Sequence, residues 1–241
     1  MKIKSFSLFL LTLLFAISCT VQKPSEREIN FNNDWKFIRA DVAGAEQPGF
    51  DDASWRTLDL PHDYSIEDLP AKEGVKQIGP FSEESAGGAS TGHVVGGTAW
   101  YRKHFKLEKA DEGKLIQVLF DGVYMNADVW INGHHLGNHP YGYTAFAYDL
   151  TPHLNPAGQE NVLAVQVKNE GKNSRWYSGS GIYRNVTLIK TNPLHIDLWG
   201  VVVKTPQVTA EKATVAVDVT LVNSSSENKN FTYKIDFTAP D

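Results

Sequence analysis

The feature that most constrains the fold is a series of short segments in which apolar and polar residues alternate. The segment Ala127–Ile131 alternates and runs directly into Asn132-Gly133, a dipeptide typical of two-residue hairpin turns. Similar segments span Leu115–Phe120, 162–167, 182–189 and 215–221. No window of helical length keeps an apolar period of 3.6. This pattern predicts an all-β chain built as an antiparallel β-sandwich or jelly roll.

A second domain is predicted after the turn-forming sequence at 191–194. We expect the jelly roll to span 29–194 and a partial immunoglobulin-like sandwich to span 195–241. Its three expected strands are 196–204, Ala213–Asn223 and 230–238. Their alternation predicts one apolar face that needs an opposing sheet; it comprises Val215, Val217, Val219, Leu221, Tyr233, Ile235 and Phe237. Either this piece packs on the first domain or the chain is cut short, and the second explanation is favoured.

The first 19 residues have the organisation of an export signal. Lys2 and Lys4 precede an apolar run over 6–17, which is too short to span a bilayer. The run ends in Ala16-Ile17-Ser18-Cys19, and Cys19 is the only cysteine of the chain. This arrangement resembles a bacterial lipobox, so we expect lipidation of Cys19, with residues 20–28 as a tether. The alternative is an ordinary secretory signal. An exported, membrane-anchored lipoprotein on the periplasmic or outer-membrane face is therefore predicted.

A long segment without regular alternation separates the predicted strands between residues 67 and 97. Its centre, 85–92, consists of small side chains that can bury little area. Loops of this length are usually functional or disordered. We expect a mobile loop here unless a partner or another domain covers it.

Composition argues against several classes of function. The formal net charge is −5, with both signs interspersed along the chain, so no basic surface for nucleic acid is expected. The histidines His134, His135 and His139 lack metal-binding spacing, because neighbours on a strand point to opposite faces. No metal site and no cofactor are predicted, and no nucleotide-binding or nucleophile-elbow motif is present.

Glycoside hydrolysis usually requires two carboxylates on either side of the bond. The adjacent acidic pairs are Asp51-Asp52, Glu67-Asp68, Glu83-Glu84 and Asp111-Glu112. Each has a polar setting and is expected to be simply solvated. None of these pairs is therefore predicted to act as a catalytic dyad.

Two clusters combine aromatic and polar side chains in the way that sugar sites do. One is 175–184, which places Arg175, Trp176 and Tyr177 before a glycine-rich turn. The other is 59–64, which contains His62 and Asp63 beside a proline. Aromatic faces pack against sugar C–H groups, while charged groups bind hydroxyls. By residue type alone, the alternative of core tryptophans and a structural Arg184 is favoured.

The same clusters form part of an ordered series that resembles glycoside hydrolase family 2, particularly its β-galactosidase-like members. The resemblance extends from about residue 29 to 194. The motifs that carry it include Asn33-Asp34-Trp35, Leu60-Pro61-His62-Asp63-Tyr64, Trp100-Tyr101-Arg102, Val129-Trp130-Ile131-Asn132-Gly133, Gly142-Tyr143-Thr144-Ala145-Phe146, Asp149-Leu150-Thr151 and Ser178-Gly179-Ser180-Gly181-Ile182-Tyr183-Arg184.

This resemblance implies a sugar-binding jelly roll followed by an immunoglobulin-like domain. In such enzymes a (β/α)₈ barrel of roughly 250 residues follows and carries both catalytic glutamates; we expect that barrel to lie outside this chain and to be its partner. The stretch 175–184 matches a loop that reaches the barrel's sugar site. Substrate contacts are accordingly expected from His62, Asp63, Arg175, Trp176 and Tyr177.

One departure concerns the expected substrate, a β-galactoside. Several family members carry an aspartate six residues before the glycine of the Gly-Ile-aromatic-Arg motif, where this chain has Arg175. A guanidinium cannot accept hydrogen bonds from sugar hydroxyls, so Arg175 would donate to hydroxyls or to an acidic group. The leading hypothesis is the N-terminal part of a family 2 enzyme. A stand-alone carbohydrate-binding lipoprotein and a structural or adhesive sandwich remain the alternatives.

Overall fold

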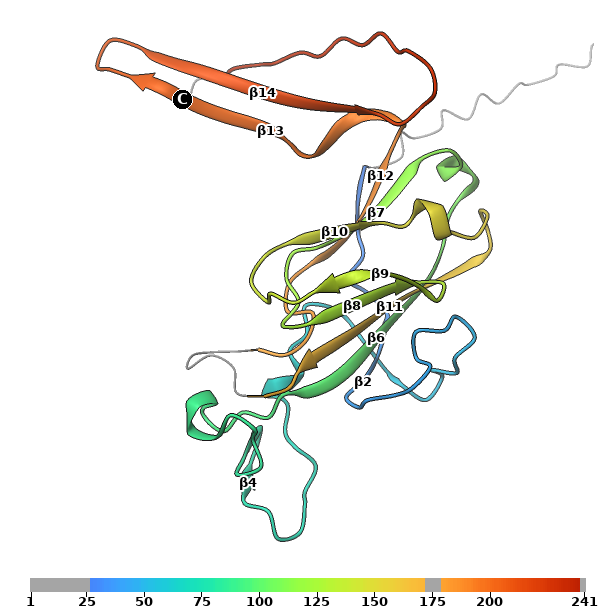
Figure 1. Ribbon diagram of the computed structural model, residues 1–241, viewed down its shortest axis with the longest axis vertical. Coiled ribbons are helices and arrows are strands. Elements are labelled where there is room, and N and C mark those ends of the chain that lie inside the picture. The colour runs from blue at the N-terminus through green and yellow to red at the C-terminus, as the bar shows by residue number, and fades with distance from the viewer. Residues whose placement is uncertain (1–26, 172–178, 239–241) are drawn as a thin grey trace, which may run out of the picture.

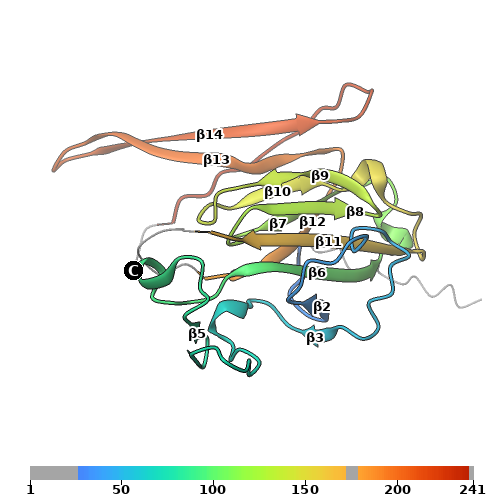
Figure 2. The same ribbon diagram turned by 60° about the horizontal axis from the view of Figure 1, so that its bottom comes forward.

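Two antiparallel sheets packed face to face form the main body of the protein (Figures 1 and 2). The computed structural model describes residues 27–171 and 179–238. One sheet has the order β1 (Glu28–Asn30), β12 (Val186–Thr191), β7 (Leu115–Phe120) and β10 (Phe146–Asp149). The other has the order β3 (Arg56–Leu58), β2 (Trp35–Ile38), β6 (Gly97–Lys106), β11 (Glu160–Asn169), β8 (Ala127–Ile131) and β9 (His134–His139). The predicted β-sandwich is confirmed.

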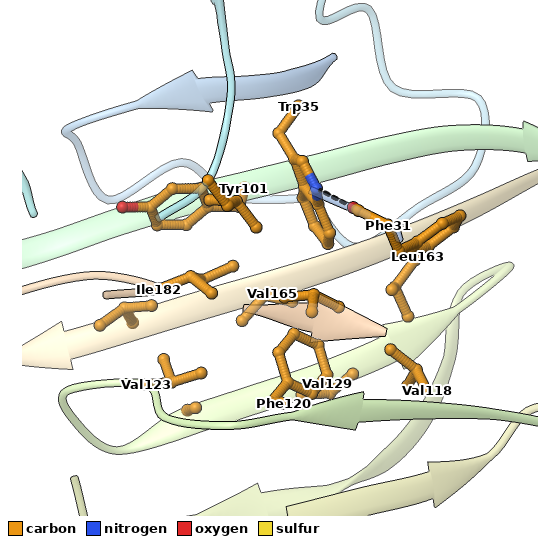
Figure 3. Packing of buried hydrophobic residues seen from close by; sticks show 14 of the residues in the cluster. Phe31, Trp35, Tyr101, Val118, Phe120, Val123, Val129, Leu163, Val165 and Ile182 are labelled. Carbon is orange, nitrogen blue, oxygen red and sulfur yellow. Dashed lines mark hydrogen bonds between the residues drawn. The ribbon is translucent and has the colours of Figure 1, made fainter. Parts of the chain in front are cut away.

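The core lies between the two sheets and follows from the alternation seen in the sequence. In β7 every second residue, Ile116, Val118 and Phe120, is buried, as expected for a strand with one face on the core. Figure 3 shows Val118 and Phe120 packed against Val129, Leu163 and Val165 of the opposite sheet. Trp35 closes one side of this core and donates its indole N–H to the carbonyl of Phe31 at 2.8 Å.

The hairpin predicted at Asn132-Gly133 joins β8 to β9. Both turn residues have positive φ, 50° and 83°, the conformation that favours Asn-Gly in such turns. The Asn132 side chain donates to the carbonyl of His153 and accepts from the backbone N–H of Val162, at 2.8 and 2.9 Å. The turn residue therefore also ties β8 to the neighbouring strand β11.

A loop over residues 39–55 covers the outer face of the six-stranded sheet and buries a charged pair. Arg102 of β6 is fully buried and donates its Nε–H to Asp52 at 2.6 Å. The expectation that Asp51-Asp52 is solvated is wrong for Asp52, which is 7% exposed. Burial raises the pKa of Asp52, but the hydrogen bonds from His104 and Arg102 outweigh it and hold that pKa below 3.8.

A second acidic pair also departs from the expectation of solvation. Asp111 ends the 3₁₀ turn η3 (Lys109–Asp111), and its side chain is almost completely buried between Lys114 and Lys190. In each case a cation from a neighbouring strand or loop makes burial of the carboxylate tolerable. A sequence pattern cannot reveal Arg102 and Lys190 as partners, because they lie 50 and 79 residues from the carboxylates they meet.

The long segment between the first strands and β6 forms an arm that projects from one end of the sandwich (Figure 1). It contains the 3₁₀ turns η1 (Tyr64–Ile66) and η2 (Gly88–Thr91) and a short hairpin of β4 (Gln77–Ile78) and β5 (Phe81–Ser82). An isolated bridge joins Phe81 to Val94. The prediction that this arm is mobile stays a prediction.

A separate hairpin follows the sandwich and consists of β13 (Leu194–Val208) and β14 (Ala213–Asn223). The third predicted strand, 230–238, is wrong, since these residues form no strand. Its apolar side chains alternate as expected but stay exposed; they are Phe231, Tyr233, Ile235 and Phe237. Among the described residues no neighbouring strand pairs with this segment, whereas β13 and β14 pair with each other, and alternation alone does not stabilise an unpaired strand.

Some boundaries differ from the sequence expectations. The strand expected over 182–189 begins only at Val186, because Gly181 and Ile182 pair with other partners described below. The remaining regular element is the 3₁₀ turn η4 (Thr151–His153). The predicted signal, the tether up to residue 26 and Cys19 lie outside the described residues. None of the helices described in residues 27–171 and 179–238 has the length and hydropathy needed to cross a membrane.

Candidate functional site

The two sequence clusters predicted to bind sugar lie side by side at one end of the sandwich. The backbone N–H of His62 donates to the carbonyl of Ile182, and the N–H of Tyr64 donates to the carbonyl of Ser180, each at 2.8 Å. Segments more than 100 residues apart are thus joined as a short antiparallel pair. This pairing holds the residues immediately after the segment 172–178.

Asp63 fastens this pairing with its side chain. One carboxylate oxygen accepts hydrogen bonds from the backbone N–H and hydroxyl of Ser65, at 2.9 and 2.6 Å, and from the N–H of Ser180 at 2.8 Å. An added Cβ at Gly179 would lie 2.7 Å from the other oxygen, so the chain passes directly over the carboxylate. Asp63 therefore positions the base of the candidate loop, and a direct contact with sugar stays a prediction.

Gly181 occupies the most crowded point of the site. Its φ of +128° is unfavourable for residues with a side chain, and a Cβ there would lie 2.4 Å from the Tyr101 hydroxyl and 2.6 Å from the His62 carbonyl. Its N–H and C=O both bond to the backbone of Tyr124, at 2.8 and 2.9 Å. The glycine lets three segments meet in a space with no room for a methyl group.

His62 points inward and is linked to a polar network instead of to open solvent. Its Nδ1 lies 2.8 Å from the Tyr101 hydroxyl, and its Nε2 lies 2.9 Å from Arg56 and 3.0 Å from Glu67. The imidazole is only 12% exposed. Burial lowers the pKa of His62 below 6.5, although Glu67 opposes this shift. Burial likewise raises the pKa of Tyr101.

We expect acidification to weaken this network through His62. Because its folded-state pKa is lowered, the unfolded chain takes up a proton more readily below pH 6.5, so stability falls as the pH drops through that range. An NMR titration of the histidine ring signals should show His62 titrating below pH 6.5, with the Tyr101 and Gly181 signals shifting together with it. A His62 ring that titrates at or above 6.5 would contradict the assignment of burial as the main cause.

A cavity of about 200 Å³ lies beside the same loop base, between β11 and the projecting arm. Its polar lining includes Glu84, Thr91, Asn169 and Glu170, and glycines supply much of the rest. Asn169 donates to the Ser180 hydroxyl at 2.7 Å, and Thr98 donates to Glu170. Amide, hydroxyl and carboxylate groups of this kind suit sugar hydroxyls.

The sequence analysis missed these four lining residues. They come from the arm and from the end of β11, and no local motif connects them. The one feature of the sequence that could have indicated them is the pair of Gly-Gly dipeptides in the arm, Gly87-Gly88 and Gly96-Gly97. Gly96 has no room for a side chain, because a Cβ there would lie 2.1 Å from the carbonyl of Asn169. Arg175, Trp176 and Tyr177 lie outside the described residues, so their predicted sugar contacts stay predictions.

Other candidate residues have structural surroundings. Trp35, Trp55 and Trp100 are buried, and Arg184 is exposed. The alternative of a core tryptophan in the 175–184 cluster concerns Trp176, which lies outside the described residues, so it stays untested. The histidines considered for metal binding lie apart: His134 stacks on His153, His135 contacts Asp128 and His139 stacks on Phe146. Across residues 27–171 and 179–238, the structure gathers no group of three or more potential metal ligands.

Comparison with known proteins assigns the family. The family model described as the sugar binding domain of glycosyl hydrolases family 2 matches residues 46–193. The chain belongs to glycosyl hydrolase family 2. This family 2 chain is 50% identical over 216 residues to a β-galactosidase of Bacteroides ovatus, covering 89% of the chain and 24% of that protein. It is 36% identical to a β-glucuronidase of Formosa agariphila, covering 84% of the chain and 22% of that protein.

The solved structures agree. A family 2 member from Bacteroides cellulosilyticus is 51% identical with a TM-score of 0.75, covering 81% of the chain and 24% of that structure. The family 2 chain thus corresponds to the N-terminal sugar-binding part of β-galactosidase- and β-glucuronidase-like proteins. It spans about a quarter of the length of the relatives it matches.

Proposed function

We propose that this chain forms the glycan-recognition part of an exported, lipid-anchored glycosidase that acts on β-galactosides. The observation that carries the proposal is the pairing of 62–64 with 180–182, which unites both sugar-binding sequence clusters. The pairing lies next to a polar cavity lined by Asn169 and Glu170. A rigid base of this kind reduces the entropy lost when a loop closes on a ligand.

The chemistry of the site favours carbohydrate over a charged or apolar ligand. The cavity combines hydroxyl, amide and carboxylate side chains with the small apolar side chains of Ala86, Val94 and Val95. Trp176 and Tyr177 follow Arg175 in the sequence and would supply ring faces for sugar C–H groups. Arg175 would donate to hydroxyls of a galactoside or to the carboxylate of a glucuronide, and the relatives named above include a β-galactosidase and a β-glucuronidase.

The test compares two proteins on chromogenic β-galactosides and β-glucuronides: the 241-residue chain and a version extended through the downstream coding sequence. We expect turnover by the extended protein only, with galactosides preferred. In the extended protein, Trp176→Ala should reduce kcat/KM about tenfold or more through the lost ring contact. The matched control is Trp199→Ala, which removes an exposed tryptophan of the β13–β14 hairpin and should leave kcat/KM unchanged.

Three results would contradict the proposal. Turnover by the 241 residues alone would place catalytic carboxylates within them. Specific sugar binding by the chain, together with no hydrolysis by the extended protein, would support a stand-alone binding protein instead. Equal losses for the two tryptophan variants would show that Trp176 has no special role at the sugar.

Anchoring needs its own experiment. We propose that Cys19 carries the lipid, which is supported by the lysines and apolar run that precede it. Expression with radiolabelled palmitate should label the chain, and Cys19→Ala should abolish the label while export continues. Continued labelling of Cys19→Ala would exclude Cys19 as the lipidation site.

A further inference from the structure

A basic cavity lies at the C-terminal end of β12 and the start of β13. Figure 1 shows these two strands where the sandwich meets the β13–β14 hairpin. Its volume is about 570 Å³, and its lining includes Arg27, Lys114, Lys190, Thr191 and His195. The candidate sugar site adjoins the residues that precede β12, so the two cavities lie at opposite ends of that strand.

The charges around this cavity are unbalanced. Lys114 and Lys190 both bond to the buried carboxylate of Asp111, and Arg27 adds a third cation. Three cations and one carboxylate leave a local charge of +2. The lysine side chains are only 15% and 10% exposed, so water screens their repulsion weakly.

Two buried polar atoms of the lining lack a hydrogen-bond partner among the described residues. They are the hydroxyl oxygen of Thr191 and Nδ1 of His195. Thr191 is 6% exposed and ends β12, while His195 lies at the start of β13. Buried polar groups in native proteins are nearly always paired, so two orphans beside three cations indicate a missing acceptor.

We propose that this cavity binds an oxyanion, either a free sulfate-like ion or a sulfate or carboxylate group carried by a sugar. Arg27 donates one Nη2–H to the carbonyl of Ile196 at 2.9 Å, and its remaining N–H groups suit the oxygens of one such anion. The lysines, both bonded to Asp111, add excess positive charge. The Thr191 hydroxyl and, in the tautomer protonated at Nδ1, the His195 ring supply two further donors. One ligand thus reduces the excess charge and satisfies both orphaned atoms.

The test measures binding of inorganic sulfate to the full 241-residue chain by calorimetry at constant ionic strength. A monosaccharide sulfate is measured in parallel, with uncharged galactose for comparison. We expect one saturable site per chain for at least one of the two anions. Tighter binding of inorganic sulfate indicates a free ion as the ligand, and tighter binding of the sugar sulfate indicates a sugar-borne anion.

Three variants keep the test specific. Arg27→Gln should weaken anion binding about tenfold or more, and Thr191→Val, which keeps the shape of the side chain, by about threefold to tenfold. Neither should impair folding, because Arg27 is exposed and the Thr191 hydroxyl has no described partner. The matched control Arg184→Gln removes an exposed arginine before the opposite end of β12 and should bind like the parent. Absence of saturable binding of either anion, or equal weakening in the control, would overturn the proposal.

Discussion

Replacing Arg102 by methionine is expected to lower the free energy of unfolding by about 3–5 kcal/mol. Arg102 is completely buried and its guanidinium bonds to Asp52 and to the carbonyl groups of Ala45 and Gln47. Methionine keeps much of the volume but leaves the Asp52 carboxylate and these carbonyls without their donor. Denaturant unfolding of the chain, followed by tryptophan fluorescence, measures the loss.

The size of this effect comes from the position of the pair. Arg102 holds the 39–55 loop against the outer face of β6, where Trp55, Trp100 and Ala164 form a second apolar cluster. Loss of the guanidinium therefore weakens the packing of the 39–55 loop on the sheet and also breaks the ion pair with Asp52. Single mutations this costly typically leave a buried charge or polar group unsatisfied.

Two further measurements separate charge from packing. The double variant Arg102→Met with Asp52→Asn should recover much of the stability, since no buried charge is left uncompensated. Because the folded-state pKa of Asp52 is lowered, its contribution is present above its unfolded pKa and is lost as the pH falls below about 4. The deficit of Arg102→Met should therefore shrink at pH 3. The matched control Arg184→Met changes an exposed residue and should alter the free energy of unfolding by at most about 0.5 kcal/mol, as is typical of surface substitutions. An equally small loss for Arg102→Met at neutral pH would contradict the role given to Arg102.

Replacing Gly181 by alanine is the second substitution with a large expected effect, about 3 kcal/mol or more. The new Cβ would meet the Tyr101 hydroxyl at 2.4 Å and the His62 carbonyl at 2.6 Å, in addition to the strain of φ +128°. Relief of that clash requires separation of the 62–64 and 180–182 segments. The variant should therefore lose both stability, measured by thermal unfolding, and the ordered base of the candidate sugar site.

Gly158→Ala is the matched control for backbone strain. Gly158 also has a positive φ, +81°, but a Cβ there would meet nothing within 4 Å. Its expected cost is about 1–2 kcal/mol, the usual cost of a left-handed conformation. Equal costs for the two variants would show that the contacts around Gly181 contribute nothing beyond strain.

The strands of the sandwich were predictable from sequence because their information is local. A period of two, interrupted by turn residues, identifies a strand with one buried face wherever it lies in the chain. The prediction of β7 and β8 matches the observed ends, and the Asn132-Gly133 turn lies where its dipeptide indicates. The order of motifs also pointed to the family that the comparisons establish.

The base of the candidate sugar site was only partly predictable. His62, Asp63 and the 179–184 turn were recognised as candidates, but their mutual contact was not. The sequence therefore presented Asp63 as a ligand for sugar, whereas in the structure its carboxylate accepts hydrogen bonds from Ser65 and Ser180. Residue type reveals what a side chain can bind, and only the fold shows which groups it has already bound.

The sequence by itself determined the strand pattern, the main turn and the family, since each rests on neighbouring residues or ordered motifs. The tertiary structure alone decided which charges are buried, as for Asp52 and Asp111, and whether an alternating segment becomes a strand, as 230–238 does not. Both outcomes depend on partners distant in sequence. A carboxylate is buried where a cation meets it, and an alternating segment becomes a strand where a neighbouring strand pairs with it, as β13 pairs with β14.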